Sequence, residues 1–430
     1  MDIVPPTKRT VSVLADLNRR LLYGLLRLFI RNKPFKGTLP IAKLSSVLII
    51  PYGDAIGDMI VASPIWRAVK RQNPNCRIGV FTSVRNESLL RADPDVDALY
   101  RFEGRRDFDH RSELRRARKE GFDLVLNVHF TNQTDYGFIA NYVGPKSIKL
   151  TGAHPRREMY QLFFNHIGSR VRHSVHLSFL SLELLAEVVE FDPPLRVGDA
   201  YPSIAISIEA EKAVAERLRT LMPEACTSYI LIHMQAGTPF REWGRANAIQ
   251  LAERLSARYP NRLILFTASP MMFPAVSKAV GDIPLESAGR IQAFETSPDL
   301  LELAALIRGA ELVITPETSI THFASATATT DHPTSVLVLM SNRDRIPMEW
   351  LPFGIPARIL APPIAGEPVA TISVADVFDA AVSLLDRKWI TTQTYLDTER
   401  PQHPLYRHSN RERLLSECDV AAPSSDIVTE

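Results

Sequence analysis

Three short segments of the 430-residue sequence combine residue types suited to chemistry on a phosphorylated substrate. The first is the run from Gly53 to Asp58 (GDAIGD), whose two glycines permit a tight turn before a predicted helix. A carboxylate at that place can act as a general base, although Asp58 can also be no more than a capping residue. The run lacks the Lys-Ser/Thr pair of a P-loop and the third glycine of a dinucleotide fingerprint.

The other two segments are suited to binding phosphate. In residues 233–243 a Gly-Thr-Pro loop precedes Arg241, whose planar guanidinium can hold a phosphate through two parallel hydrogen bonds. The alternative is that Arg241 pairs with Glu242 or a surface carboxylate while Trp243 packs under the next helix. In residues 315–322 hydroxyl side chains open a predicted helix, whose N-terminal amides attract anions, and ordinary capping by Thr318 or Ser319 is the alternative.

Each segment follows a predicted strand and precedes a predicted helix. Apolar runs predict strands at 46–50, 77–82, 98–102, 122–128 and 147–150, and the pattern restarts with strands at 229–233, 262–267, 311–315 and 335–340. Helical periodicity between the strands predicts an α/β fold with two doubly wound parallel sheets. In such a fold the ligand lies at the carboxyl ends of the strands, in the cleft between the domains.

The chain is predicted to have five parts. They are a basic amphipathic segment at 1–43, a Rossmann-like domain at 44–192, a linker and connecting helix at 193–227, a second Rossmann-like domain at 228–388 and a C-terminal extension at 389–430. The small, polar end of the extension is predicted to be disordered.

The net charge of +2 conceals an uneven distribution. Residues 1–43 hold nine cations and two anions, a balance of +7, which leaves −5 for the remainder of the chain. Leucines at 14, 17, 21, 25 and 28 recur on one helical face, and Asp16, Arg20, Arg27 and Arg31 recur on another. Such a helix either lies in a membrane interface or packs on the protein's own surface, and both alternatives are carried forward.

The composition excludes several classes of protein. Ordinary apolar and charged fractions of 45% and 23% rule out a disordered, collagenous or multi-span membrane protein. We expect neither a membrane-spanning helix nor a cleavable signal, because charges interrupt every long apolar run. Cys76, Cys226 and Cys418 lie too far apart for a zinc knuckle or a local disulfide framework, which fits a reducing cytosol.

Residues 45–360 resemble glycosyltransferase family 9, the ADP-heptose:lipopolysaccharide heptosyltransferases. The resemblance rests on the opening strand, Gly-Asp loop and helix of residues 46–68, the strand at 122–128, the loop at 233–243, the helix and strand at 300–315, and the turn at 317–322. It implies a GT-B fold with an N-terminal acceptor domain and a C-terminal nucleotide-sugar domain. It also implies inverting, metal-independent transfer of heptose or a related sugar from an ADP-sugar to a lipopolysaccharide core or similar acceptor, with no cofactor besides this co-substrate.

The resemblance also assigns residues by their match to the family motifs. Asp58 matches the proposed base and Arg241 matches a lysine that contacts the donor phosphate. The donor-binding turn corresponds to Glu317, Thr318, Ser319, Thr321 and His322. Four positions depart from the pattern, namely Gln235 for glycine, Arg241 for lysine, Glu317 for aspartate and Ser319 for glycine, so the donor's identity is an open question.

Acceptor binding is predicted in the first domain, on a basic surface suited to a phosphorylated, lipid-linked saccharide. The residues proposed for it are Arg156, Arg157, Arg170 and Arg172, accompanied by His154, His166, His173 and His176. The arginines between 101 and 118 are interpreted as a solvated helix face, because four carboxylates dilute them. No nucleic-acid module is evident.

We expect a cytoplasmic protein that can attach peripherally to the cytoplasmic face of the inner membrane. The alternatives are another GT-B glycosyltransferase, a sugar-nucleotide epimerase, or a non-catalytic scaffold that binds a nucleotide sugar.

Overall fold

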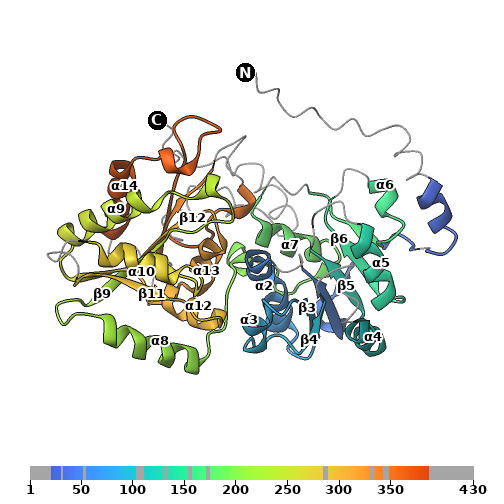
Figure 1. Cartoon of the computed structure of the whole chain (residues 1–430). Helices are drawn as coiled ribbons and strands as arrows, with labels where there is room; N and C mark the ends of the chain where they lie inside the picture. The colour runs from blue at the N-terminus through green and yellow to red at the C-terminus, as the bar shows by residue number, and fades with distance from the viewer. Residues whose placement is uncertain are drawn as a thin grey trace, which may run out of the picture.

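The computed structural model describes residues 21–30, 32–51, 55–102, 111–128, 130, 134–153, 157–170, 175–283, 289–329, 334–341 and 348–386. They form two α/β lobes that lie side by side, each built around a six-stranded parallel sheet (Figure 1). The predicted fold class, two doubly wound parallel sheets, is confirmed.

The first sheet has the strand order β4-β3-β2-β5-β6-β7. Its strands are β2 (Ser46–Ile50), β3 (Arg77–Thr82), β4 (Ala98–Arg101), β5 (Leu124–Asn127), β6 (Ile148–Thr151) and β7 (His166–Ile167). The accompanying helices are α2 (Ile56–Gln72), α3 (Glu87–Arg91), α4 (Arg111–Glu120), α5 (Thr134–Val143), α6 (Arg157–Tyr160) and α7 (Leu177–Ala186). A separate two-stranded sheet pairs β1 (Leu39–Pro40) with β8 (Val189–Glu190).

The second sheet repeats this topology in the order β11-β10-β9-β12-β13-β14. Its strands are β9 (Ser228–His233), β10 (Arg262–Ala268), β11 (Ile291–Glu295), β12 (Leu312–Pro316), β13 (Ser335–Leu339) and β14 (Ala357–Leu360). Its helices are α8 (Ile208–Leu221), α9 (Arg245–Arg258), α10 (Phe273–Gly281), α12 (Leu300–Arg308), α13 (Ser319–Thr327) and α14 (Val374–Asp386).

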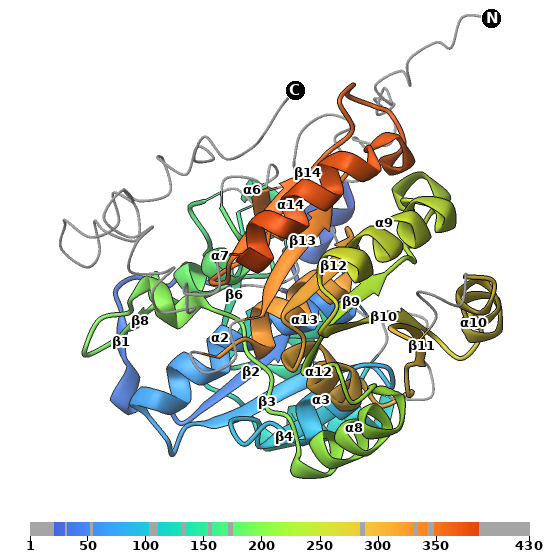
Figure 2. The same ribbon diagram turned by 90° about the vertical axis from the view of Figure 1, so that its left-hand side faces the viewer.

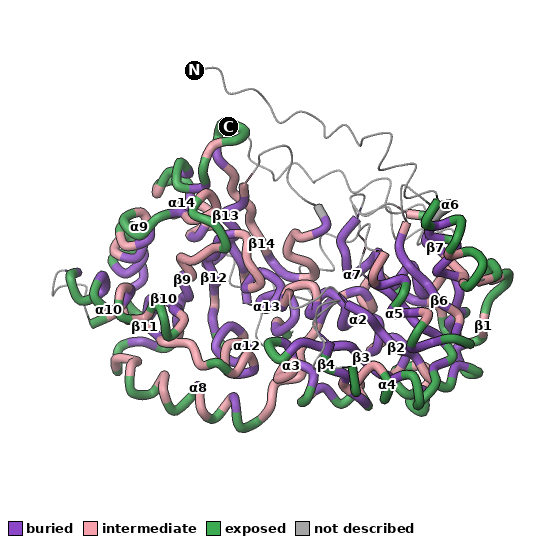
Figure 3. The backbone as a smooth tube through the Cα atoms, turned by 45° about the vertical axis from the view of Figure 1, so that its right-hand side comes forward, coloured by how far each residue is buried: buried purple, intermediate pink, exposed green. Residues whose placement is uncertain are grey.

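Both faces of each sheet are buried, as the alternation of side chains along a strand requires. In β9, Ile230 and Ile232 join a core cluster with α9 and α14, whereas Leu231 joins a cluster with α8, α12 and α13 on the opposite face. The buried tube segments in the middle of both lobes show these cores (Figure 3), and Figure 2 shows α9 and α14 across the second sheet from α8 and α12.

The two lobes share one apolar interface. Ile56 and Ile60 of α2 belong to the same buried cluster as Ile320 and Phe323 of α13. The chain crosses between the lobes near this interface, where the amide of Ser203 donates to Ser63 Oγ at 2.9 Å. Because burial of apolar side chains is the main stabilising term in folding, this shared cluster fixes α2 against α13.

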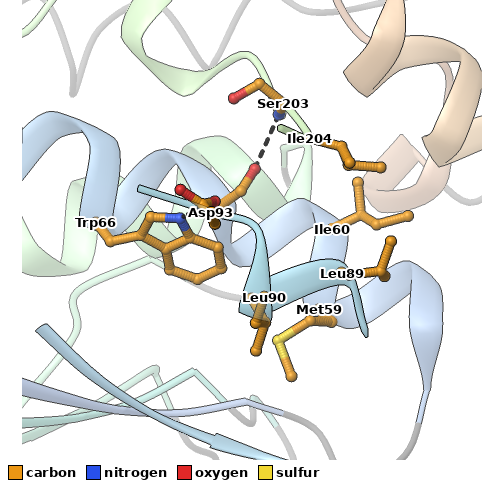
Figure 4. A pocket seen from close by; sticks show the side chains of 9 residues that line it. Met59, Ile60, Trp66, Leu89, Leu90, Asp93, Ser203 and Ile204 are labelled. Carbon is orange, nitrogen blue, oxygen red and sulfur yellow. Dashed lines mark hydrogen bonds between the residues drawn. The ribbon is translucent and has the colours of Figure 1, made fainter. Parts of the chain in front are cut away.

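A small cavity of about 10 Å³ lies beside that crossing (Figure 4), and this volume admits about one water molecule. Trp66 and Asp93 lie on one side of it, joined by an indole-to-carboxylate hydrogen bond of 2.9 Å, and Ile204 lies on the other. No residue predicted to bind donor or acceptor lines the cavity, so it belongs to the crossing between the lobes.

Edge strands account for most of what the sequence pattern missed. β7 is two residues long, and β11 and β14 contain polar or charged residues with intermediate exposure, so none forms an apolar run. The predicted linker is also more ordered than its Pro and Gly content suggested, because Leu195 and Ala200 enter the first lobe's core. The boundaries between the five predicted parts stay a prediction, and residues 387–430 lie outside the described part of the chain.

The N-terminal segment packs through a different face from the predicted one. Residues 21–26 are helical, and Tyr23, Leu26 and Ile30 pack against the core of the first lobe. Leu21, Leu25 and Leu28, the described members of the predicted apolar face, are 60–62% exposed. The other predicted leucines, Leu14 and Leu17, lie outside the described residues. Of the predicted polar face, Asp16, Arg20 and Arg31 lie outside them too, and only Arg27 is described. No helix among the described residues combines the length and the apolarity needed to cross a bilayer.

Candidate active site

The three motif segments meet the sheets where the strand order reverses. The first segment follows β2, which pairs with β5, and the other two follow β9 and β12, which pair with each other. In open α/β sheets the crevice beyond the carboxyl ends of these strands receives the ligand. Topology therefore brings the predicted residues to the two positions where a ligand would bind.

Asp58 lies in the first turn of α2, where the helix dipole favours an anionic side chain. The N-cap position belongs to Ala55, which makes no side-chain capping hydrogen bond. Asp58 is partly exposed. Asp54, the nearest alternative base, lies outside the described residues.

Gly57, the residue before Asp58, touches the second lobe. A Cβ atom placed on Gly57 would lie 2.8 Å from Cδ2 of His322, closer than real Cβ contacts allow. His322 is on α13 and belongs to the third motif segment. The small residue at position 57 therefore allows the first and third segments to come together.

Arg241 joins the second segment to the third. It ends the short 3-10 helix η4 (Pro239–Arg241), and its Nη1 lies 3.6 Å from Oε1 of Glu317. Of the two alternatives raised for this segment, the pairing of Arg241 with Glu242 does not occur, because its partner is Glu317. Trp243 is buried as that alternative supposed and donates its indole N–H to the carbonyl of Ile372 at 2.8 Å.

The carboxylate of Glu317 interacts with Arg241 on one oxygen and with Ser341 on the other, although burial disfavours its charged form. Burial raises the pKa of its carboxyl, while the nearby Arg241 guanidinium and a hydrogen bond from Ser341 Oγ act to lower it. The Ser341 hydroxyl lies 3.2 Å from Oε2 of Glu317, opposite the arginine. Ser341 was not predicted as a site residue, and its only signal in the sequence was its place just after the strand at 335–340.

At the start of α13, one hydroxyl group caps the helix and another has no hydrogen-bond partner among the described residues. Thr318 is the N-cap residue: its Oγ1 accepts from the amide of Ile320 at 3.3 Å and lies 3.1 Å from Oγ1 of Thr315. The capping alternative is therefore correct for Thr318. Ser319 follows as the first helical residue, and the buried Oγ1 of Thr321 has no hydrogen-bond partner among the described residues.

His322 and His176 form a buried aromatic group between the lobes. Their ring centroids are 6.5 Å apart, His176 stacks on Phe353 at 4.6 Å, and Trp350 meets His322 edge-on at 5.6 Å. Burial lowers the pKa of His322 to about 4 and, together with the neighbouring His322, lowers that of His176 to about 3. Both imidazoles are therefore neutral at pH 7, and no described residue bonds to Nδ1 of His322.

The predicted acceptor residues are only partly described. Arg157 is exposed at the start of α6, and Arg170 pairs with buried Glu183 at 3.0 Å; Arg156 and Arg172, with His154 and His173, lie outside the described residues. His176 caps α7 by accepting from the amide of Ser178, which places it in the aromatic group above. The acceptor role of the four arginines stays a prediction.

The comparisons with known proteins agree with the observed fold. No protein-family model matches the chain. Over 290 residues, 64% of this chain and 77% of the relative, it is 22% identical to lipopolysaccharide heptosyltransferase 3 of Escherichia coli K12. It also matches the structure of a family 9 glycosyl transferase from Veillonella parvula, with a TM-score of 0.66 and 16% identity over 82% of this chain and 99% of that one.

A third match is E. coli ADP-heptose lipopolysaccharide heptosyltransferase II, with a TM-score of 0.61 and 15% identity over 80% of this chain and 99% of that one. The chain is similar to heptosyltransferases of glycosyltransferase family 9. The predicted GT-B architecture is thereby confirmed, and the proteins that the chain resembles are glycosyltransferases, as the sequence resemblance implied. The roles of its individual site residues stay predictions.

Proposed function

We propose that this chain is an inverting glycosyltransferase that moves heptose, or a related sugar, from an ADP-sugar to a lipopolysaccharide core or similar envelope saccharide. One observation carries the proposal, namely that all three motif segments meet at the strand-order reversals of two Rossmann-like sheets. Arg241 reaches Glu317 at 3.6 Å, and Gly57 packs directly against His322. These contacts support a site in which Asp58 is the base, Arg241 is the cation and α13 supplies the helix N-terminus.

In the proposed reaction the acceptor hydroxyl attacks the anomeric carbon of the donor sugar. Asp58 takes the hydroxyl proton as the new C–O bond forms, a contribution of about 10²–10⁴-fold to the rate. The bond from the anomeric carbon to the diphosphate oxygen breaks on the opposite face, so the configuration inverts and ADP leaves.

The departing diphosphate gains negative charge, which fixed positive groups would stabilise. We assign this role to Arg241 and to the first amides of α13, with Thr318 and Ser319 at the helix start. Thr321 and His322 supply polar atoms that have no partner among the described residues. These groups would take the place of a metal ion, and we propose that no metal or other cofactor is required.

The acceptor is proposed to be lipid-linked, and the donor to be cytosolic. The sequence relative is a lipopolysaccharide heptosyltransferase by name, which supports a lipopolysaccharide acceptor. We propose that the chain meets this acceptor at the cytoplasmic face of the inner membrane. The four predicted arginines of the first lobe are proposed to meet the acceptor's phosphates.

The experiment that tests the proposal is turnover with ADP-heptose and a lipid A–Kdo acceptor, with and without EDTA. We expect product of inverted anomeric configuration at a rate that EDTA does not change. ADP-, GDP- and UDP-sugars should be compared for binding by calorimetry, since Gln235, Glu317 and Ser319 depart from the family pattern. Binding without turnover on any lipopolysaccharide acceptor would contradict the proposed reaction and favour a nucleotide-sugar scaffold.

A further inference from the structure

An exposed apolar ridge crosses the outer end of the first lobe. It is formed by side chains of the N-terminal segment that are 50–84% exposed, namely Leu21, Leu22, Leu25, Leu28 and Phe29. The short blue helix that carries most of it lies beside α5 and α6 at the right of Figure 1. Large apolar side chains gathered at one surface mark an interaction site, whereas scattered ones need no explanation.

The ridge is held in place by the opposite face of the same helix. Tyr23 is buried, donates or accepts a 2.7 Å hydrogen bond with Thr134 Oγ1, and meets Phe163 edge-on at 5.8 Å. Leu26 and Ile30 pack against the same core. Tyr23, Leu26 and Ile30 thus hold the segment on the lobe, and the leucines of the ridge take no part in these contacts.

A network of side-chain hydrogen bonds around Asn32 holds the chain just after the ridge. The Asn32 side-chain amide donates to the carbonyls of Leu162 and Phe163 and to Oδ1 of Asn141, at 2.8–3.0 Å. Nζ of the buried Lys149 donates in turn to Oδ1 of Asn32 at 3.0 Å. Because buried polar networks of this kind specify one arrangement, the ridge keeps a fixed orientation on the lobe.

The surroundings of the ridge are aromatic and basic. Phe138 and Tyr142 of α5 are each 41% exposed, and Phe138 lies 5.0 Å from Phe163, the ring that Tyr23 also contacts. The Arg118 guanidinium lies 4.8 Å from the Tyr142 ring centroid. The sequence of residues 1–43 holds nine cations against two anions, and the cations among its described residues are Arg27, Lys33, Lys36 and Lys43. Apolar side chains beside aromatic rings and cations match the interface of an anionic bilayer.

We infer that this ridge docks the first lobe on an anionic lipid bilayer. The choice of a lipid bilayer as the partner rests in part on the reaction proposed above. Thr134, which Tyr23 contacts, begins the helix that follows β5 in the first lobe. Docking through the ridge would bring the first lobe, which is proposed to bind the acceptor, to the bilayer that holds a lipid-linked saccharide.

The test uses the full chain with vesicles of phosphatidylcholine and phosphatidylglycerol, and no donor. The triple variant Leu21→Gln, Leu25→Gln and Phe29→Gln should bind about 100-fold more weakly, because three apolar side chains no longer enter the interface. Binding of the parent should fall with added salt and on vesicles of phosphatidylcholine alone. The matched control, Ile208→Gln, Met271→Gln and Ile364→Gln, removes three similarly exposed apolar side chains from the second lobe and should bind as the parent does.

Other occupants of the ridge would give different results. Unchanged vesicle binding by the ridge variant would overturn the proposal. A dimer of the parent that the ridge variant breaks, without vesicle binding, would assign the ridge to a second copy of the chain. A fall in thermal stability of the ridge variant, without vesicle binding by the parent, would assign it to internal packing. Turnover on a delipidated acceptor saccharide reports on the transferase separately, so failure of one proposal is distinct from failure of the other.

Discussion

Gly57 and His322 lie in direct contact across the two lobes, and the contact leaves no room for a side chain on Gly57. A Cβ atom there would come within 2.8 Å of the imidazole Cδ2. The flanking clusters are buried on both sides, with Ile56 and Ile60 facing Ile320 and Phe323. The contact therefore couples the placement of Asp58 on α2 to the placement of α13.

Gly57→Ala should destabilise the protein by about 1–3 kcal/mol, because an added methyl in a packed interface forces neighbouring groups to move. Urea unfolding of the parent and the variant measures the loss. His322→Ala should relieve the clash, so the double variant should lose less stability than the two single variants added together. Strict additivity would show that Gly57 and His322 do not meet as described.

The stability of the protein should fall as the pH drops below about 6.5, the ordinary pKa of histidine in an unfolded chain. Burial lowers the folded-state pKa of His176 to about 3 and those of His233 and His322 to about 4. Between those values and pH 6.5 the unfolded chain binds more protons, so acid favours unfolding. Their stabilising contribution is complete above pH 6.5 and is lost progressively down to pH 3–4.

The measurement is the free energy of unfolding at pH 7 and pH 5. Glu183 affects the pH dependence of stability in the opposite direction. Burial raises its pKa to about 7, so below that pH the folded state binds more protons at this group than the unfolded chain does. The comparison is therefore made in the Glu183→Gln variant, where His322→Gln should reduce the dependence on pH. An equal dependence with and without His322 would contradict its assignment as a buried neutral group.

The sequence pattern was sufficient for the strands that have a continuous buried and mostly apolar centre. β2, β9 and β12 are such strands, and the rule that ligands bind at the carboxyl ends of parallel strands then brought the motif segments together. The partner of Arg241 could not be predicted in the same way, because it depends on the register of β9 against β12. The apolar side of the N-terminal helix was too broad to show that Tyr23, rather than Leu21 or Leu25, faces the core.

Arg241 and Glu317 should have opposite effects on binding of ADP. Arg241→Gln removes a charged hydrogen-bond donor to the diphosphate and should weaken binding about ten- to hundredfold. Glu317→Gln removes a negative charge 3.6 Å from that guanidinium, so ADP should bind at least as tightly as to the parent. Calorimetry measures both, with Arg245→Gln at the exposed start of α9 as the matched control. Parallel losses in the Arg241 and Glu317 variants would instead indicate that the ion pair binds the donor as a unit.

Asp58→Asn should lower kcat by about 10²–10⁴-fold and leave ADP binding unchanged, because the amide preserves the shape of the side chain but cannot accept the acceptor's proton. Asp376→Asn is the matched control, since Asp376 occupies the first turn of α14, far from the motif segments in the chain, and its change should leave kcat as in the parent. Asp54→Asn tests the competing carboxylate of the same loop. Turnover of the Asp58 variant near the parent's rate, with a large loss in the Asp54 variant, would transfer the role of base to Asp54. A loss of ADP binding in the Asp58 variant would instead make Asp58 part of the donor site, because a base that acts on the acceptor has no contact with the bound nucleotide.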